Sequence, residues 1–226
     1  MKLLAVSPHL DDAAFSAGGL IAARVGAGWQ AIVATCFTGS VPHPTGFALA
    51  CQLDKGLGPE IDYMALRRAE DEAACRELGA SVRHLPFLEA PHRGYESAPA
   101  LFAGRLAGDD MVERLAPALV DLIARERPDL ILGPLCLGNH VDHHIVHDAL
   151  ARVAPDALLW EDWPYADRAP PVAQTPALVE PLTPVTCARR VAACAAYRSQ
   201  LGFQFGGVDA MTRRIDAIAV ERYYRA

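Results

Sequence analysis

Two short segments of the chain gather histidine and aspartate, the side chains that bind metal ions and transfer protons. One is PHLDD at residues 8–12, and the other is HVDHH at residues 140–144. Together they hold three carboxylates and four imidazoles, and four of the eight histidines of the chain lie within residues 140–147. Packing alone does not explain this clustering, because carboxylates are rarely buried unless they are paired. The two segments therefore form the candidate site.

The spacing of these side chains suits a catalytic metal ion. A catalytic zinc takes three protein ligands from His, Asp or Glu and keeps an open position for water. His9 and Asp12 are three residues apart, on one side of a helical first turn, and one residue of the second segment would complete a set of two histidines and a carboxylate. Nitrogen and oxygen ligands without cysteine suit Zn²⁺, and also Fe²⁺, Mn²⁺ or Co²⁺.

The side chains that are left over could carry out hydrolysis. A bound metal lowers the pKa of a water molecule to roughly 7, and a nearby carboxylate can then take its proton. A remaining histidine could face the oxyanion that develops when a carbonyl group is attacked. The two segments together therefore predict a metal-dependent hydrolase.

Simpler roles compete for some of these residues. Asp11 or Asp12 could cap the helix that follows them. His147 lies four residues after His143, on the same face of a helix, but an ordinary surface histidine is the simpler interpretation, and the same holds for His144. No function is assigned to the isolated histidines, which are His43, His84 and His92.

The elements that must position the two segments alternate between strand and helix. Apolar runs predict strands at residues 2–8, 30–37, 81–88, 129–136 and 157–163. Helical patterns cover residues 14–26, 62–78, 110–126, 143–153 and 186–201. Such alternation implies parallel pairing through right-handed crossovers. The expected fold is α/β, with one open, mostly parallel sheet and helices on both faces, in a single domain over residues 1–226.

Both candidate segments directly follow predicted strands, at residues 2–8 and 129–136. In open α/β sheets, ligands bind beyond the carboxyl ends of the strands, so the two segments are expected at the same edge. The stretches 39–61 and 89–108 show neither a helical nor a strand periodicity. Loops of this length are uncommon in a compact domain and are often functional. Residues 164–184 are predicted to form a Pro-rich connecting segment, and residues 208–226 a C-terminal tail with a mixed pattern.

Composition excludes several other classes of protein. Hydrophobic residues make up 52% and charged residues 21% of the chain, so a sizeable core is expected. The net charge of −6 argues against a nucleic-acid binder. No apolar run reaches the roughly 18 residues of a membrane span, and the N-terminus lacks the pattern of a signal peptide. The six cysteines form no CxxC pair, so reduced cysteines and a cytoplasmic location are expected. A homo-oligomer is compatible with the sequence.

A nucleotide-binding α/β module is the main alternative of another class. The first strand is followed by neither a GxGxxG fingerprint nor a GxxxxGK[ST] phosphate loop. Gly18 and Gly19 lie inside a predicted helix, where they indicate close packing of that helix against a neighbour. The sequence therefore favours the hydrolase over this alternative.

Four segments resemble one known family, the PIG-L/LmbE-like zinc deacetylases. PHLDD resembles the (A/P)HxDD signature of that family, and HVDHHIVHDA resembles its HxDH motif. LRRAEDEAACRELGA resembles the RxxE helix that ends in Leu-Gly, and WEDWPYA resembles an ED-x-PYA segment of some members. The matching pieces run from residue 3 to about residue 200. Ala13 is a departure, because many members have glutamate after the second aspartate.

The resemblance implies a Rossmann-like α/β fold and a set of metal ligands. In the family, zinc is bound by the histidine and second aspartate of the first motif and the last histidine of the second. In this chain these positions are His9, Asp12 and His143.

The resemblance also implies functions for the remaining residues. Asp11 would be the general base, and His140 would polarise the carbonyl or protonate the leaving amine. Asp142 would orient a histidine, and Arg67 would contact sugar hydroxyls.

The implied activity is removal of the acetyl group from an N-acetylglucosamine-type sugar conjugate, with a GlcNAc-malate precursor of a thiol as one candidate. The alternative at the same metal is hydrolysis of another N-acyl substrate, such as an antibiotic or lipid intermediate. The expected partner is in either case a small molecule.

Overall fold

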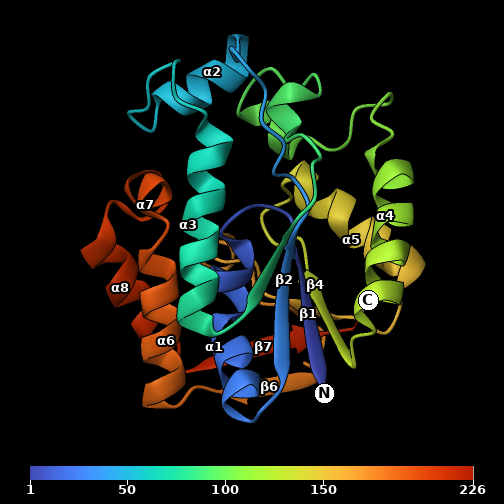
Figure 1. Cartoon of the computed structure of the whole chain (residues 1–226), viewed down its shortest axis with the longest axis vertical. Helices are drawn as coiled ribbons and strands as arrows, with labels where there is room; N and C mark the ends of the chain where they lie inside the picture. Colours follow the sequence, from blue (N-terminus) through green and yellow to red (C-terminus); the bar gives the residue numbers. More distant parts are fainter. Residues whose placement is uncertain (226) are drawn as a thin grey trace.

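A seven-stranded sheet forms the centre of the computed structural model, which describes residues 1–225 (Figure 1). The strand order is β3-β2-β1-β4-β5-β7-β6. The strands are β1 (Lys2–Ser7), β2 (Gln30–Thr35), β3 (Ser81–His84), β4 (Leu130–Pro134), β5 (Leu158–Trp160), β6 (Leu178–Pro181) and β7 (Val220–Tyr224). β1 to β5 pair in parallel, whereas β7 runs antiparallel to β5 and β6. The mostly parallel sheet predicted from the sequence is confirmed.

Helices cover both faces of the sheet, as the sequence predicts. They are α1 (Asp12–Gly26), α2 (Gly46–Leu53), α3 (Tyr63–Leu78), α4 (Met111–Glu126), α5 (Val141–Val153), α6 (Pro184–Ala195), α7 (Arg198–Phe205) and α8 (Val208–Asp216). On one face α6 packs against α1, α3 and α8, and on the other face α4 packs against α5 (Figure 1). The Rossmann-like arrangement is therefore confirmed.

The central strand β1 explains why this sequence builds two cores. Leu3 and Ala5 belong to the core beneath α1, α3 and α6, while Leu4 and Val6 belong to the core beneath α4 and α5. All four side chains are fully buried. Because successive side chains of a strand point to opposite faces, a strand covered on both faces has to be apolar throughout.

Some segments differ from what the sequence predicts. The short helix α2 forms within residues 39–61, where no regular structure is expected. Residues 164–184 contribute β6, and the tail 208–226 forms α8 and β7, with residue 226 outside the described residues. β6 and β7 pair with each other across a helical segment, a non-local interaction that leaves no periodic signal in either strand.

The single helix predicted over residues 186–201 is two helices, α6 and α7, that separate at Tyr197. No glycine or proline marks this break in the sequence. The Tyr197 hydroxyl instead donates to Asp71 Oδ1 of α3 at 2.7 Å. The break therefore coincides with a tertiary contact that local pattern cannot reveal.

Gly18 and Gly19 allow a buried ion pair to approach α1. A Cβ atom on Gly18 would lie 2.9 Å from Arg190 Cγ, and one on Gly19 would lie 2.7 Å from Glu221 Oε1. Arg190 Nη1 is 3.2 Å from Glu221 Oε1. Arg190 also donates to the carbonyl oxygen of Phe15, and the Glu221 carboxylate accepts from the Gly19 N–H at 2.8 Å. The close packing predicted for the two glycines is confirmed.

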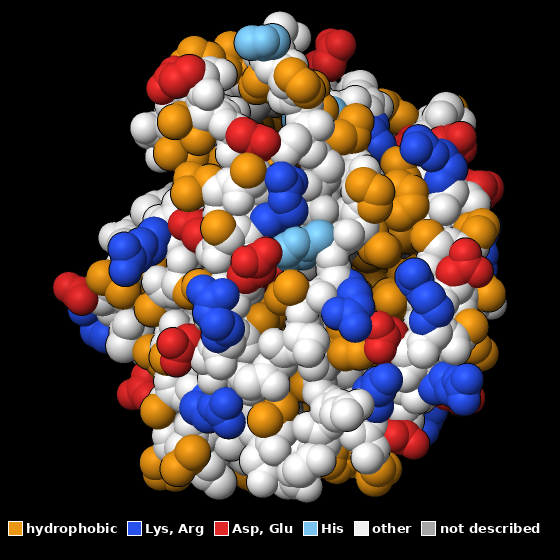
Figure 2. Space-filling view, in the orientation of Figure 1, with side chains coloured by type: hydrophobic (Ala, Val, Ile, Leu, Met, Phe, Trp, Pro, Cys, Tyr) orange, Lys and Arg blue, Asp and Glu red, His pale blue; other side chains and the backbone are white. Residues whose placement is uncertain are grey.

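The chain has six free cysteines, of which Cys51 alone is only half-buried. Within residues 1–225, no helix has both the length and the apolar character needed to cross a bilayer. Figure 2 shows acidic and basic side chains interspersed over one face of the molecule. That face therefore lacks the extended basic patch that binds nucleic-acid backbones.

We expect Glu221→Gln to lower the free energy of unfolding by about 3–5 kcal/mol, because it leaves the Arg190 charge buried and unpaired. Urea-induced unfolding measures this change. The matched control is Glu180→Gln, which removes a partly exposed partner of Arg24 and should cost no more than about 1 kcal/mol. Equal effects of the two substitutions would contradict a structural role for the buried pair.

Candidate active site

The two histidine–aspartate segments meet at the carboxyl ends of β1 and β4, which are neighbours in the sheet. α1 and α5 begin at Asp12 and Val141, slightly earlier than the sequence predicts, so both segments lie at helix N-termini. Their side chains line or border a cavity of about 380 Å³. The parallel sheet thus brings together residues that are far apart in the chain.

His9 and His143 are each oriented by a carboxylate. His9 Nε2 lies 2.9 Å from Asp142 Oδ2, and His143 Nδ1 lies 2.8 Å from Asp162 Oδ1. Histidines that bind metal ions commonly donate their second ring N–H to a carboxylate, which fixes the tautomer and leaves the other nitrogen as the ligand. Both rings have this arrangement, which leaves His9 Nδ1 and His143 Nε2 as the available nitrogens.

Asp12 lies beside both of these nitrogens. Its Oδ2 is 3.2 Å from His9 Nδ1 and 3.3 Å from His143 Nε2. His143 Nε2 is buried and makes no hydrogen bond within residues 1–225, and a buried polar atom of this kind is rare in native proteins. A divalent cation held by His9, Asp12 and His143 would provide the partner. Two nitrogens and a carboxylate oxygen fit zinc.

His140 offers a competing ligand set, because ring nitrogens of His9, His140 and His143 lie within 4.8 Å of one another. The hydrogen bonds favour Asp12 as the third ligand. His140 Nδ1 accepts from the Asp142 N–H at 3.2 Å, so the neutral ring carries its proton on Nε2 and has no free lone pair. Burial and the nearby His9 lower the pKa of His140 to about 3. His140 is therefore a neutral hydrogen-bond donor.

The charges of the cluster favour a cation. Burial opposes protonation of His143, but Asp12 and Asp162 outweigh it and raise the pKa of His143 to about 9. Burial likewise opposes ionisation of Asp12, yet His143 and His9 hold the pKa of Asp12 well below its usual range. Asp12 is thus a carboxylate, and the negative charge of Asp12 and Asp162 that favours a proton on His143 would equally favour a metal ion in place of that proton.

Asp11 does not act as a helix cap, although it occupies the N-cap position of α1. Its Oδ2 instead accepts a hydrogen bond from Gln204 Nε2 at 2.9 Å, and its Oδ1 lies 3.5 Å from Arg67 Nη2. Burial raises the pKa of Asp11 to about 7, with Arg67 acting in the opposite direction. A carboxyl group with a pKa near neutrality can both accept and return a proton.

Arg67 reaches the same cavity from α3. Its Nη1 is 2.5 Å from Glu89 Oε1, and its Nη2 donates to the carbonyl oxygen of Leu10 at 3.3 Å. Arg67 and Glu89 both line the cavity. A molecule bound in the cavity would therefore find hydrogen-bond donors on Arg67 and hydrogen-bond acceptors on Glu89.

Residues 89–108, predicted as a functional loop, contain two short 3-10 helices, η1 (Ala90–His92) and η2 (Pro99–Phe102). The Ala90 N–H donates to Asp142 Oδ2 at 3.1 Å, and Arg93 Nη2 donates to Asp142 Oδ1 at 2.8 Å. Burial opposes ionisation of Asp142, but the hydrogen bond with His9 and the Arg93 charge keep the pKa of Asp142 well below its usual range. Among the histidines, the Asp142 side chain bonds to His9 rather than His140.

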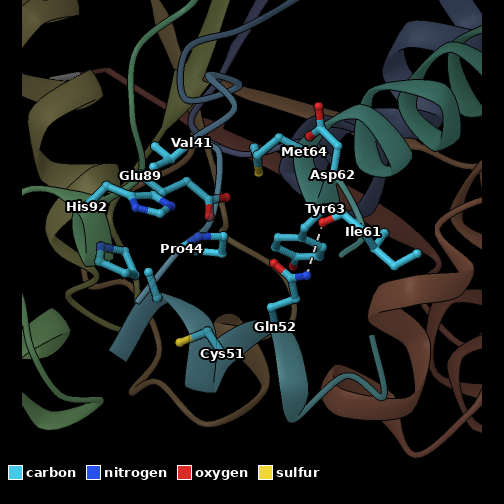
Figure 3. A pocket seen from close by; sticks show the side chains of 12 residues that line it. Val41, Pro44, Cys51, Gln52, Ile61, Asp62, Tyr63, Met64, Glu89 and His92 are labelled. Carbon is cyan, nitrogen blue, oxygen red and sulfur yellow. Dashed lines mark hydrogen bonds between the residues drawn. The ribbon is translucent and has the colours of Figure 1, made fainter. Parts of the chain in front are cut away.

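α2 and the start of α3 form one wall of the site. A second cavity of about 30 Å³ adjoins the main one there, and Tyr63 and Glu89 line both. Gln52 Nε2 donates to the carbonyl oxygen of Ile61 at 3.1 Å, and Figure 3 shows Gln52 beside Tyr63 at this cavity. Gln52 therefore holds the segment that precedes α3 against α2.

The residues singled out from the sequence come together at this site. Six of them line the main cavity, namely His9, Asp11, Asp12, Arg67, His140 and Asp142, and His143 lies buried against Asp12. His144 and His147 stand apart from the cluster. His144 Nε2 lies 3.4 Å from Asn139 Oδ1, and His147 Nδ1 lies 3.0 Å from the Pro134 carbonyl oxygen.

Sequence reasoning missed several residues of this site, among them Asp162, Arg93 and Gln204. Asp162 belongs to the WEDWPYA segment, so a signal for it was present. Arg93 and Gln204 lie in segments that carry no motif. They are found only through their contacts in the folded chain.

Fold and site together define a Rossmann-like α/β protein whose buried histidines and aspartates suit a divalent metal ion. The family model described as PIG-L, GlcNAc-PI de-N-acetylase, matches residues 4–154. The chain belongs to this family.

Characterised relatives are similar over much of the chain. The 2'-N-acetylparomamine deacetylase of Streptomyces fradiae is 36% identical over 170 residues, which are 73% of this chain and 58% of that protein. The chain thus spans well under two thirds of that relative's length. The structure of the A40926 pseudoaglycone deacetylase Dbv21 superposes with a TM-score of 0.83 at 28% identity, covering 99% of this chain and 96% of that chain. The zinc-inhibited form of teicoplanin deacetylase Orf2 has a TM-score of 0.83 at 25% identity, covering 100% of this chain and 99% of that chain.

The contact between Asp162 and His143 can be tested through metal affinity. Asp162→Asn retains the shape of the side chain but removes the charge that orients His143. We expect the affinity for Zn²⁺ to fall about 10- to 100-fold, measured by competition with a chromophoric chelator. The control is Asp156→Asn, at a side chain that is 98% exposed, which should leave the affinity unchanged. Unchanged affinity in Asp162→Asn would count against His143 as a ligand.

Proposed function

We propose that the protein is a zinc-dependent N-deacetylase that removes the acetyl group from an N-acetylated amino sugar within a small-molecule conjugate. One observation carries the proposal. Asp11, a buried carboxyl group that lines the cavity, lies next to His9, Asp12 and His143, whose side chains are suited to bind a metal ion. Membership of a family described by de-N-acetylation supports the reaction type. The named relatives, all deacetylases, support it further.

His9, Asp12 and His143 would hold the metal ion, because the buried His143 Nε2 makes no hydrogen bond among the described residues and lies beside the Asp12 carboxylate. When bound, the ion supplies positive charge that polarises the amide carbonyl and makes an attacking water more acidic. Fe²⁺, Mn²⁺ and Co²⁺ accept the same donors, so elemental analysis of the isolated protein identifies the metal.

Asp11 acts on the attacking water in the proposed reaction. Its carboxylate removes a proton while the water oxygen bonds to the carbonyl carbon. The Nε2–H of His140 donates a hydrogen bond to the carbonyl oxygen as that oxygen becomes negative. When the C–N bond breaks, Asp11 returns the proton to the departing nitrogen. The products are acetate and a free amine.

The lining of the cavity favours a sugar that carries a bulky group. Arg67 and Glu89 provide donors and acceptors for sugar hydroxyls, while Phe47, Phe102 and Phe203 provide an aromatic part of the lining. Phe102 is 42% and Phe203 is 63% exposed. Exposed aromatic side chains at the mouth of a polar site are suited to stacking against rings of a ligand.

The relatives favour a natural-product conjugate over a thiol precursor as the substrate. One relative is named for acetylated paromamine, and two are named for a pseudoaglycone and for teicoplanin. A GlcNAc-malate precursor is the alternative sugar substrate, and an N-acyl intermediate with a longer acyl chain is the alternative amide. A substrate panel separates these candidates.

We expect Asp11→Asn to lower kcat by about 10²- to 10⁴-fold while the protein keeps its metal, because the substitution removes the base but no ligand. His143→Ala should lose both the metal and the activity. Acetate release and elemental analysis of both variants measure these outcomes. Near-wild-type activity in Asp11→Asn would refute the assignment of the base.

The substrate proposal is tested by acetate release from free N-acetylglucosamine, GlcNAc-malate and aryl N-acetylglucosaminides. We expect kcat/KM to be about tenfold higher for the aryl conjugates than for the free sugar, because the aromatic side chains contact the attached ring. Chelation should abolish the activity, and added Zn²⁺ should restore it. Faster cleavage of N-butyryl than of N-acetyl substrates would instead favour a general amidase.

A further inference from the structure

Gln204, near the end of α7, makes the only hydrogen bond to the Asp11 carboxylate that is found among residues 1–225. Its Nε2 donates to Asp11 Oδ2 at 2.9 Å. Arg67 Nη2 is farther away, 3.5 Å from Asp11 Oδ1, and its guanidinium is already engaged by Glu89 and the Leu10 carbonyl. Gln204 therefore holds one carboxylate oxygen and leaves the other one for proton transfer.

The orientation of the Gln204 amide suits the ionised form of Asp11, which is the form that acts as the base in the proposed reaction. With Nε2 facing Asp11, the amide Oε1 is buried and has no hydrogen-bond partner within the described chain. The reversed amide would set two acceptor oxygens against each other. An unpaired buried oxygen costs stability, and such groups in native proteins often belong to functional sites. The benefit of glutamine at this position therefore lies in its contact with Asp11.

α7 is anchored to the rest of the molecule without this contact. The Ser199 N–H and Oγ donate to the Glu70 carboxylate of α3 at 2.8 Å and 2.7 Å. Leu201 and Phe205 are buried in the core shared with α1 and α3. The Gln204 side chain is thus carried to Asp11 by a helix that other residues already hold in position.

We propose that Gln204 is a positioning residue for the general base Asp11, an inference that rests on the proposed function. By holding Oδ2, the amide restricts rotation of the carboxylate and keeps Oδ1 directed to the water and then to the departing nitrogen. Gln204 forms and breaks no covalent bond. Alignment of a reacting group is a large part of catalysis. Residue 204 lies outside residues 4–154 matched by the family model, so the C-terminal part of the chain supplies this support.

Gln204→Met tests the proposal, because methionine keeps the length of the side chain but cannot donate. We expect kcat to fall about 10- to 100-fold, the loss expected for a hydrogen bond to a charged group. KM should stay within about twofold, and the zinc content should not change. The matched control is Ser199→Ala, which removes a hydrogen bond that docks α7 but does not touch Asp11, and should retain the wild-type kcat.

A double-mutant cycle separates positioning from a merely structural role. In an Asp11→Asn background, Gln204→Met should change kcat by no more than about twofold, because the group it positions is gone. If Gln204→Met unfolds, Gln204→Asn replaces it, since the amide is then one methylene too short to reach Asp11, and the same loss is expected.

Three results would overturn the proposal: an unchanged kcat in Gln204→Met, an effect confined to KM, or an equal loss of kcat with and without Asp11. A wild-type enzyme that releases no acetate from any substrate would refute the proposed function itself. The acetate-release assay of the wild-type enzyme reveals that outcome before any variant is compared.

Discussion

Parallel pairing of β1 with β4 is the constraint on which the site depends. Leu4 pairs with Ile131 in this register, so both strands end at the same edge of the sheet and each is followed by the first turn of a helix. The turn after β4 is tight, with Gly138 and Asn139 at positive φ values of 89° and 63°. A Cβ atom on Gly138 would lie 2.7 Å from Tyr165. Glycine is therefore needed where the chain turns toward the site.

One carboxylate connects this turn to the candidate metal centre. Asp162 Oδ2 accepts from the Leu137 N–H at 2.8 Å, while its Oδ1 lies 2.8 Å from His143 Nδ1. The residue that orients a candidate ligand thus also holds the backbone that leads to it. Asp142 has a similar double function, because it contacts both His9 and Arg93. Each of these two buried carboxylates has partners that offset its desolvation.

Much of the fold could be predicted from local patterns in the sequence. The five parallel strands and the helices α1, α3, α4 and α5 show their apolar runs or helical periods directly, whereas α2 does not. β6, β7 and the break before α7 could not be predicted, because they depend on pairing and contacts between distant segments. The residues of the site likewise fall into those that the sequence predicts and those that it does not. Histidines and paired aspartates are rare enough in clusters to be noticed, whereas Arg93 and Gln204 are ordinary polar residues whose importance comes only from what they contact.

Asp11 and Asp12 are adjacent in the sequence, yet the fold gives them opposite environments. Asp12 lies beside two histidines that keep its pKa well below the usual range, which suits a ligand that must remain ionised. Burial raises the pKa of Asp11 to about 7, which suits a group that accepts and returns a proton. Such divergence between neighbouring carboxyl groups separates electrostatic and acid–base roles in many active sites. The two side chains differ because they have different partners: Asp12 lies beside His9 and His143, whereas Asp11 accepts from Gln204 and lines the cavity. In the proposed reaction, the aspartate that contacts the histidines would hold the metal ion, and the aspartate that faces the cavity would act on the substrate.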